Sequence, residues 1–317
     1  QDEAVMIKTM GIDVGGTNLR IGVFDDLHLI EEVRIQADFS RICNNNPPEK
    51  AWQSILSVMA QGIQSVLRQH HEIHHIGIGF PGFIDPDTQV IAQSPNLPGL
   101  THVSLANDLT ALVQKKVIII NDANAAALGE YYLAGKPATG LIYLGLGTGV
   151  GGGLILNGQP YVGHHGCAME VGHLMVVPEG RLCGCGNVGC IEQYASASGV
   201  SLSYEESTKQ TLSAVAIASL ATAGDRDAIQ AYTIAAHTLA QALASTLKII
   251  DVQHVVIGGG MAGAWPLMEI AFQQRLNHDL MPVLRQKINI QLSNAQDRAG
   301  MLGAAQLSVT QSIGSIE

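Results

Sequence analysis

Two short strands joined by a glycine-rich turn open each half of the chain, and this repeat constrains the fold more than any other feature. In the first half, the apolar stretch MIKTMGIDV (6–14) leads into the turn GGTN (15–18), and LRIGVF (19–24) alternates as a strand should. In the second half, LIYLGLGTG (141–149) and GGLILNG (152–158) form the same pattern. The repeat suggests two halves built on one scheme, as an internal duplication would produce.

Helical and strand patterns alternate along the rest of the chain. A third short strand near 31–36 completes an opening meander, and residues 49–69 place their apolar side chains on one helical stripe. The strands IGIGF (76–80) and VIII (117–120) are short and wholly apolar, which is typical of the buried strands of an α/β protein. The later elements are predicted as helices at about 208–222, 225–250 and from Pro266, strands at 254–260 and 288–292, and a last helix from Arg298. A chain of 317 residues is long enough for two domains.

The two glycine-rich turns have the chemistry of a phosphate-binding site. Glycine lets the backbone approach a phosphate closely and turn its N–H groups toward it, and threonine adds a hydroxyl donor. Both DVGGTN (13–18) and LGTGVGGG (146–153) contain these residues, and Asp13 stands beside the first turn, where it could hold a magnesium ion. One such turn alone would be an ordinary hairpin turn. Two of them, each opening one half of the chain, indicate a nucleotide.

Two better-known nucleotide motifs do not apply. The sequence contains no GxxxxGK[ST], so it is not a P-loop enzyme. Residues 147–152, GTGVGG, match GxGxxG, and Glu170 lies near the spacing expected of a ribose-binding acid. The segment that follows is nevertheless predicted as strand and turn, whereas a dinucleotide-binding fold needs a helix there. The glycine pattern therefore favours a different nucleotide-binding fold.

Charge and hydropathy limit the partners. The formal net charge is −10 and the sequence has no basic cluster, so we expect no nucleic-acid partner. The first residues, QDEAVMIKTM, carry acids where a signal peptide has basic residues, and no run of eighteen apolar residues occurs. We therefore expect no membrane partner and a cytoplasmic protein.

Polar side chains directly follow the apolar strand 117–120. Asn121 and Asp122 stand at the C-terminal end of that strand, where α/β proteins place their chemistry. Asp122 suits either the N-cap of the helix behind it or a general base, and the two roles need not exclude each other. Counted together, the amides and carboxylates that could bind sugar hydroxyls are Asn96, Asn121, Asp122, Glu170 and Glu192.

Three cysteines, Cys183, Cys185 and Cys190, lie within eight residues and follow His173. Together they supply the four ligands that a closed tetrahedral zinc site needs. A disulfide between the first two is disfavoured because a single residue separates them, and a cytoplasmic chain disfavours a bridge to the third. Four protein ligands leave no position for water, so we predict a structural zinc that positions the carboxylates on either side of the loop. The alternative is three free thiols in a glycine-rich loop.

These motifs together resemble those of the ROK family (repressor, open reading frame, kinase), which includes sugar kinases of the actin-like ATPase fold. The combination of EVGH with Cys-x-Cys-x4-Cys-x-Glu is the most specific part of the resemblance. Repressors of the family carry an additional N-terminal helix-turn-helix domain, whereas here the first phosphate strand begins almost at once. The matching pieces cover almost the whole chain in the family's order: DVGGTNLRIG (13–22), GFPGFID (79–85), SPNLPG (94–99), NDANAAALGE (121–130), LGTGVGGG (146–153), EVGH (170–173), CGCGNVGCIEQYAS (183–196) and VIGGGM (256–261).

The resemblance implies a role for each matching residue. Asp122 matches the catalytic base, which takes the proton from a sugar hydroxyl as that hydroxyl attacks the γ-phosphate of ATP. The sugar-binding positions match Asn96, Asn121, Asp122, Glu170, His173 and Glu192. The nucleotide-binding positions match Asp13, Gly15, Gly16, Thr17, Gly147, Thr148 and Gly149, with Gly258, Gly259 and Gly260 as the adenosine motif. The zinc ligands match His173, Cys183, Cys185 and Cys190, and His173 can serve twice because its second ring nitrogen can face the sugar.

The resemblance thus implies a two-lobed actin-like (ribonuclease H-like) α/β fold with a structural zinc loop. We place the N-terminal lobe at residues 1–121, completed by a C-terminal helix at 299–317, and the C-terminal lobe at 122–298. The implied activity is an ATP- and Mg²⁺-dependent hexose kinase that also binds Zn²⁺ and forms a homodimer. SPNLPG and CIEQYAS look most like the glucokinase branch, with an N-acetylmannosamine or N-acetylglucosamine kinase as the alternative. A non-catalytic sugar sensor is a further alternative, which Asp122 and the two glycine turns argue against.

Overall fold

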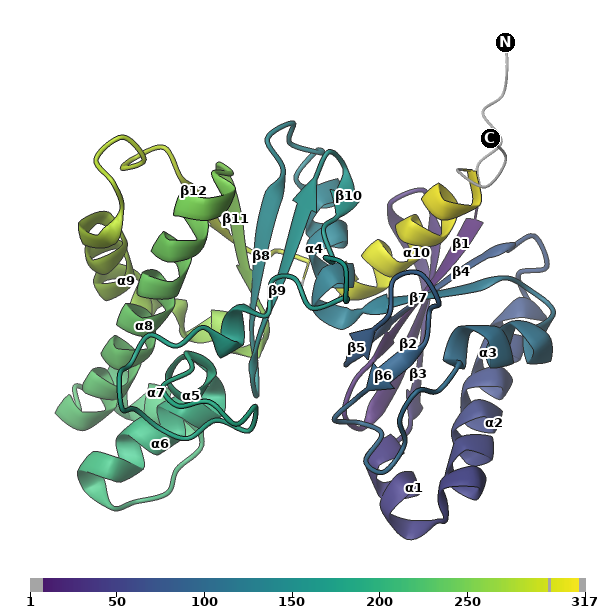
Figure 1. Cartoon of the computed structure of the whole chain (residues 1–317), viewed down its shortest axis with the longest axis horizontal. Helices are drawn as coiled ribbons and strands as arrows, with labels where there is room; N and C mark the ends of the chain where they lie inside the picture. The colour runs from purple at the N-terminus through teal and green to yellow at the C-terminus, as the bar shows by residue number, and fades with distance from the viewer. Residues whose placement is uncertain (1–7, 296–297, 314–317) are drawn as a thin grey trace. The chain divides into compact units, whose positions relative to one another are not determined.

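In the computed structural model, which describes residues 8–295 and 298–313, the first predicted hairpin belongs to a five-stranded sheet (Figure 1). β1 (Lys8–Val14) pairs antiparallel with β2 (Asn18–Asp25), which pairs antiparallel with β3 (His28–Gln36). On its other side β1 pairs parallel with β4 (His75–Phe80), and β4 pairs parallel with β7 (Val117–Asn121). The predicted meander is confirmed, although residues 6 and 7 of the predicted first strand lie outside the described residues.

Helices cover both faces of this sheet. On one face, α1 (Phe39–Asn45), α2 (Pro48–Leu67) and α3 (Leu105–Val113) share an apolar core with side chains of β1 and β4. The predicted helical stripe at 49–69 supplies much of this core, because its apolar residues recur with the helical period. On the other face lies α10 (Arg298–Ile313).

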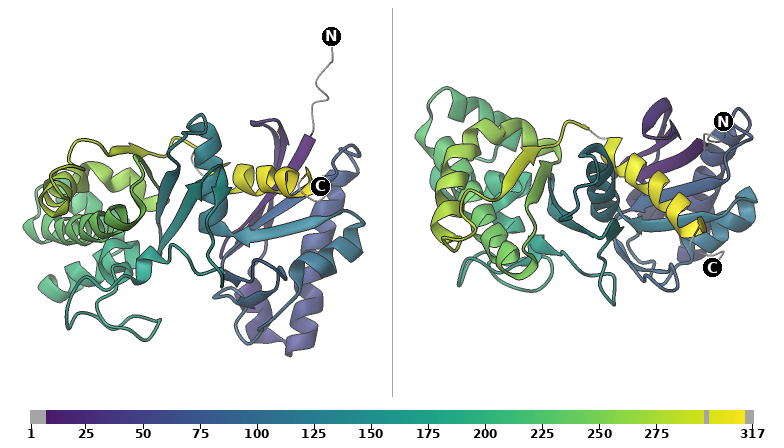
Figure 2. Two further views of the ribbon diagram at one scale, coloured as in Figure 1. Left: turned by 45° about the horizontal axis from the view of Figure 1, so that its top comes forward. Right: turned by 90° about the horizontal axis from the view of Figure 1, so that it is seen from above.

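Two glycines allow α10 to approach the sheet closely. Gly11 of β1 and Gly77 of β4 are partners in the sheet register, and a Cβ atom added at either would lie 1.8 Å from a carbonyl oxygen of α10. α4 (Asp122–Leu133) runs alongside α10 with a similar close approach at Gly129. The two helices are seen side by side in both orientations of Figure 2, with α10 in yellow.

The second predicted hairpin belongs to another five-stranded sheet. β8 (Leu141–Leu146) and β9 (Val150–Leu156) form the hairpin, and the order is β10-β9-β8-β11-β12. β11 (His254–Gly258) pairs parallel with β8 and with β12 (Asn289–Leu292), while β10 is Gln159–Pro160. In both sheets a hairpin's first strand has a parallel neighbour on its other side, which agrees with the predicted internal repeat.

The helices of the second half are α5 (Glu192–Ala195), α6 (Ala197–Thr208), α7 (Ala214–Thr222), α8 (Arg226–Ile250) and α9 (Trp265–Asp279). The predicted helices at 225–250 and from Pro266 are confirmed. Of the helix predicted at about 208–222, only the part from Ala214 onward is present, as α7. α6 ends at Thr208 with Lys209 in the left-handed region, at φ 63°. α7 then begins afresh, because the side chain of Ser213 accepts a hydrogen bond from the Ala216 N–H at 3.3 Å and caps the helix.

The chain divides into two compact units by its internal contacts. Unit 1 comprises the described residues of Gln1–Pro137, Gly153–Ala168 and Asp297–Glu317, and unit 2 those of Ala138–Gly152 and Met169–Gln296. The division falls within β9, and α10 belongs to unit 1 with the first sheet. Within the described ranges of both units, no helix has the length and apolar character needed to cross a membrane.

Candidate active site

In unit 1, the carboxyl ends of three parallel strands bring three predicted site residues, Asp13, Asn121 and Asp122, to one edge of the first sheet. Asp13 of β1 is the register partner of Gly79 in β4, and Phe80 of β4 is the partner of Asn121 in β7. Asp122 follows at once as the first residue of α4. A Cβ atom at Gly79 would lie 3.1 Å from the Ala125 Cβ in the first turn of α4, so glycine there lets the helix start close to the strand.

The helix cap at this edge is Asn121 rather than Asp122. The Asn121 Oδ1 accepts hydrogen bonds from the Ala123 and Asn124 N–H groups at 3.0 and 3.2 Å, and its Nδ2 donates to the Gly82 carbonyl at 3.2 Å. Asp122 Oδ1 also accepts from the Ala123 N–H at 3.0 Å. The N-cap interpretation of Asp122 is therefore wrong, while its role as a base stays a prediction.

Asn96 contacts the first glycine turn directly. Its Nδ2 donates to the Gly15 carbonyl at 3.2 Å, and its backbone N–H donates to the Ser94 Oγ at 3.1 Å. The turn itself is closed by a hydrogen bond from the Gly15 N–H to the Asn18 carbonyl at 2.8 Å. Gly16 and Thr17 at its tip are exposed. A predicted sugar ligand and a predicted phosphate turn thus meet within unit 1.

Asp13 has a partner that sequence reasoning missed. Its Oδ2 lies 3.3 Å from the Nη2 of Arg20, its register partner on β2, and the Arg20 side chain is only 11% exposed. Because the Arg20 guanidinium is well covered, its ion pair holds the Asp13 carboxylate in place at the edge of the sheet. Its predicted role as a magnesium ligand would have to operate beside this guanidinium.

In unit 2, the second glycine turn is held by the residues that follow the cysteines. The turn is closed by a hydrogen bond from the Gly147 N–H to the Gly149 carbonyl at 3.0 Å. The Gly147 carbonyl accepts from the Ala197 N–H at 2.9 Å, and the Thr148 carbonyl accepts from the Ser198 Oγ at 3.2 Å. The start of α6 is therefore anchored on the turn.

Glu192 also contacts this turn. Its Oε2 accepts a hydrogen bond from the Val150 N–H at 3.0 Å, and a Cβ atom at Gly149 would lie 2.4 Å from the same oxygen. A side chain at Gly149 would therefore displace the Glu192 carboxylate from this position. Sequence reasoning placed Glu192 only in the sugar site.

The predicted adenosine motif lies beside the second turn. Because β8 and β11 are parallel, Gly258 at the end of β11 pairs with Gly145 near the end of β8. Gly259 has φ 84°, and a Cβ atom there would lie 2.3 Å from the Leu146 carbonyl oxygen. Gly260 begins the short 3-10 helix that follows (Gly260–Ala264). The motif's backbone is therefore packed against the strand that leads into Gly147.

Glu170 and His173 lie in the same unit and close to each other. The Glu170 Oε2 is 4.0 Å from the His173 Nε2. Burial raises the pKa of Glu170 above its usual value, the nearby His173 lowers it, and the Glu192 carboxylate raises it further. The influence of Glu192 on this pKa means that three predicted sugar ligands share one region of unit 2.

The four predicted zinc ligands converge. Their ligand atoms, from His173, Cys183, Cys185 and Cys190, all lie within 4.8 Å of one another. The His173 Nδ1 is 3.5 Å from the Cys183 Sγ, and the Cys185 and Cys190 Sγ atoms are 3.6 Å apart with no disulfide. Four tetrahedral ligands at zinc–ligand distances of about 2.0–2.3 Å would be about 3.5–3.8 Å apart. The donor set therefore fits a structural zinc, and the His173 Nε2 remains directed toward Glu170.

A backbone N–H group of the loop favours the thiolate form of one of these cysteines, Cys185. The N–H of Asn187 is the main cause that lowers the pKa of Cys185 to about 7, while burial raises the pKa of Cys190. Cys183 and Cys190 are buried and Cys185 is exposed. Because metal ligands must be deprotonated, binding of zinc would release protons from the buried thiols.

Comparison with known proteins agrees with the resemblance seen in the sequence. The ROK family model matches residues 9–311, and the chain therefore belongs to the ROK family. It is 30% identical to the glucokinase of Thermotoga maritima, over 95% of this chain and 97% of that protein. It is 33% identical to the N-acetyl-D-glucosamine kinase of an Escherichia coli strain, over 95% and 99% of the two chains.

A solved structure confirms the expected fold. The ROK family glucokinase of Streptomyces griseus, solved in complex with glucose and AMPPNP, is similar to this chain with a TM-score of 0.78 and 27% identity, over 96% of this chain and 99% of that one. The two-sheet α/β architecture is therefore the actin-like ATPase fold of ROK kinases, and the kinase class is confirmed at the level of the family and its relatives. The individual catalytic and binding roles remain predictions.

Proposed function

We propose that this protein transfers the γ-phosphoryl group of ATP to a hydroxyl of glucose, forming glucose 6-phosphate and ADP. The observation that carries the proposal is the edge of the first sheet, where Asp122, Asn121 and the Asn96–Gly15 contact lie together. A base, amide ligands and a phosphate turn are the parts that such a transfer needs. The similarity to the Thermotoga maritima and Streptomyces griseus glucokinases supports glucose as the acceptor.

In this proposal the chain's own residues act by alignment. Asn96 and Asn121 orient the sugar, and the Asp122 carboxylate accepts the proton of the attacking hydroxyl as the bond to phosphorus forms. The backbone N–H groups of the two glycine turns bind phosphate oxygens. Mg²⁺, held from Asp13, would supply further charge neutralisation for the phosphates, and Zn²⁺ would hold the cysteine loop.

An N-acetylhexosamine kinase is the second candidate. It is favoured by the 33% identity to the Escherichia coli N-acetyl-D-glucosamine kinase, which covers 95% of this chain. The same base and phosphate turns would serve either acceptor, so the candidates differ only in the group accepted at the second carbon of the sugar.

Kinetics on a sugar panel separate these candidates. ADP release would be measured with Mg-ATP and glucose, mannose, fructose, allose, N-acetylglucosamine or N-acetylmannosamine. We expect the highest kcat/KM on glucose. A higher value on an N-acetyl sugar would transfer the proposal to the second candidate, and folded, zinc-loaded protein without turnover on any sugar would refute the kinase and favour a sugar sensor.

We further propose that the protein acts in the cytoplasm as a homodimer, as the family resemblance implies. Light scattering coupled to size-exclusion chromatography tests the assembly. A mass of twice 33.5 kDa is expected, and a mass of 33.5 kDa would contradict it.

A further inference from the structure

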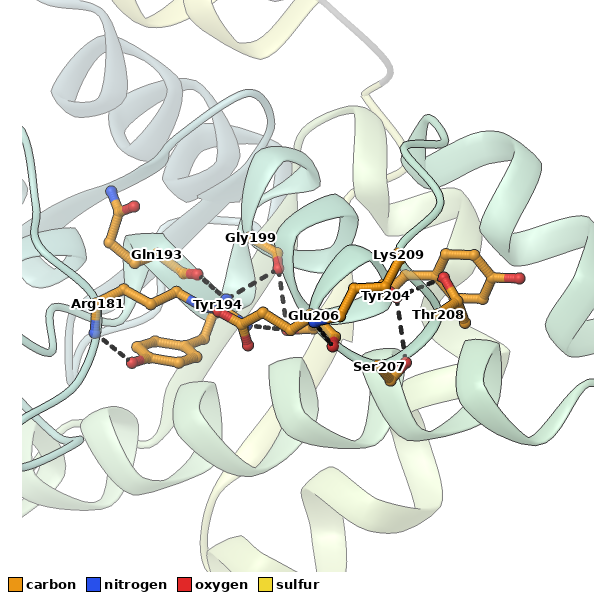
Figure 3. A network of polar contacts seen from close by, with 10 residues as sticks. Arg181, Gln193, Tyr194, Gly199, Tyr204, Glu206, Ser207, Thr208 and Lys209 are labelled. Carbon is orange, nitrogen blue, oxygen red and sulfur yellow. Dashed lines mark hydrogen bonds and ion pairs between the residues drawn. The ribbon is translucent and has the colours of Figure 1, made fainter.

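Arg181 ties the cysteine loop to the helices that follow it (Figure 3). We define the zinc loop as residues 173–190. Arg181 lies two residues before the predicted ligand Cys183, and only 13% of its side chain is exposed. A guanidinium this well covered needs several hydrogen-bond partners, because burial of an unpaired charge is costly.

The first group of partners lies on α6. The Nε and Nη2 atoms of Arg181 donate to the two carboxylate oxygens of Glu206 at 2.8 and 2.7 Å, a bidentate pair. Nη2 also donates to the Ser203 Oγ at 2.9 Å, and Nη1 donates to the Gly199 carbonyl at 3.2 Å. The hydrogen bond from Arg181 holds the pKa of Glu206 below its usual range, so this carboxylate stays ionised at neutral pH.

The second group of partners lies on α5, which begins at Glu192. Nη1 of Arg181 donates to the Gln193 carbonyl, and the guanidinium carbon lies 4.4 Å from the centroid of the Tyr194 ring. The Arg181 backbone N–H donates to the Tyr194 hydroxyl at 2.7 Å. The main chain and the side chain of Arg181 therefore both hold α5. They restrain Gln193 and Tyr194, the two residues that follow Glu192.

These contacts form a continuous path from the zinc loop to the second glycine turn. The Gln193 Nε2 lies 3.7 Å from the Cys183 Sγ, and the neighbouring Glu192 accepts the Val150 N–H at 3.0 Å. The short helix α5 has four residues, too few to be stable by itself. Its position must therefore come from such tertiary contacts, and Arg181 supplies three of them.

We infer that Arg181 is a positioning residue that sets the place of the Glu192 carboxylate for substrate binding. Arg181 touches no substrate in this assignment; it acts through the Gln193 carbonyl and the Tyr194 side chain, which belong to the two residues that follow Glu192. The inference rests on the proposed function, because it takes Glu192 as a sugar ligand. The guanidinium fork is essential to the role, since only a planar fork can bond Glu206, Ser203 and a carbonyl together.

The kinetic test compares R181M with R275M. Arg275 is the matched control, because its guanidinium also bonds a carboxylate, Asp279 at 2.6 Å, and an amide, Gln241 at 3.0 Å, on α9 and α8. Among the described residues, its one link to the zinc loop is the 3.4 Å hydrogen bond from Gln241 to the Val176 carbonyl, which lies far along the loop from α5. We expect R181M to lose about 10–100-fold in kcat/KM for glucose, as is typical when a supporting residue behind a ligand is removed. The loss should lie in KM for glucose, with zinc content unchanged, and R275M should match the wild type.

A double-variant comparison separates positioning from general stability. If Arg181 acts through Glu192, E192A and R181M/E192A should have the same kcat/KM, because the group being positioned is already gone. R275M/E192A should likewise match E192A. Losses for R181M and E192A that multiply in the double variant would overturn the inference. If R181M does not fold, R181K serves instead, and we expect an intermediate loss because lysine keeps the charge without the fork.

Hydrogen exchange tests the same inference without turnover. R181M should speed exchange of the Val150 amide, whose acceptor is Glu192, whereas R275M should not. Unchanged exchange at Val150 in R181M overturns the positioning role whatever the activity. Faster exchange in a protein that phosphorylates no sugar would refute the proposed function and leave the positioning role standing.

Discussion

Removing the Glu192 carboxylate should weaken nucleotide binding even when no sugar is present. The residue belongs by sequence to the sugar site, yet its Oε2 accepts the Val150 N–H at 3.0 Å, at the end of the second phosphate turn. A hydrogen bond to a charged group contributes about 1.5–3 kcal/mol. Val150 is 6% exposed, so in E192A its N–H would gain little compensation from water. If the turn must be ordered to bind phosphate, losing the whole free energy of this hydrogen bond would weaken the affinity for the nucleotide by about 10–100-fold.

The assay is calorimetric titration of a non-hydrolysable ATP analogue into sugar-free protein. E192Q should lie between the wild type and E192A, because its amide oxygen can still accept the Val150 N–H without the charge. The matched comparison is S198A, which removes a 3.2 Å bond from an exposed hydroxyl to the Thr148 carbonyl and should change the affinity by less than about tenfold. An E192A protein with the affinity of the wild type would refute the reasoning and confine Glu192 to the sugar.

Three further predictions address the metal, pH and packing. Metal analysis should find one zinc per chain. Removing the zinc with a chelator should unfold the zinc loop and raise KM for glucose, because zinc binding supplies folding free energy to such a loop, and a metal-free protein with unchanged KM would contradict this. Burial lowers the pKa of His75 below 6.5, so the unfolded chain binds this proton at a higher pH than the folded chain does. The free energy of unfolding should therefore fall as the pH drops below about 6.5. In urea unfolding, this free energy should depend less on pH in H75Q than in the wild type, and an equal pH dependence would exclude His75 as the cause. Gly77→Ala places a Cβ atom 1.8 Å from the Ala304 carbonyl oxygen and should lower the free energy of unfolding, measured by thermal unfolding, by at least about 1–3 kcal/mol. Gly263→Ala has open space at its Cβ atom and should lower it little, so equal effects of the two variants would contradict the close packing of α10.

The elements with strong local signals could be predicted from the sequence. The helical stripe at 49–69 and the long helix at 225–250 appear within one or two residues as α2 and α8, because their apolar period is unbroken. Both glycine-turned hairpins are also present. The converging zinc ligands follow from local spacing, since three of the four lie within eight residues.

Other features depend on contacts that sequence spacing does not reveal. The break between α6 and α7 arises from the Ser213 cap, which an apolar period does not register. Helices α1 and α3 were not predicted, since they are short and lack a long apolar stripe. The Glu192–Val150 hydrogen bond spans 42 positions of the sequence. The Arg181 contacts with α5 and α6 likewise depend on the fold of the loop, although a lone arginine beside a cysteine cluster could have drawn attention to them.

If Asp122 is the base of a glucose kinase, its role is tested by the rate of ADP release by Asp122→Asn with Mg-ATP and saturating glucose. Asparagine keeps the shape of the side chain and an oxygen for the Ala123 N–H but cannot take the proton. We expect a fall in kcat of about 10²–10⁴-fold, with glucose still bound in a calorimetric titration. A variant that keeps most of its turnover would contradict the assignment of the base.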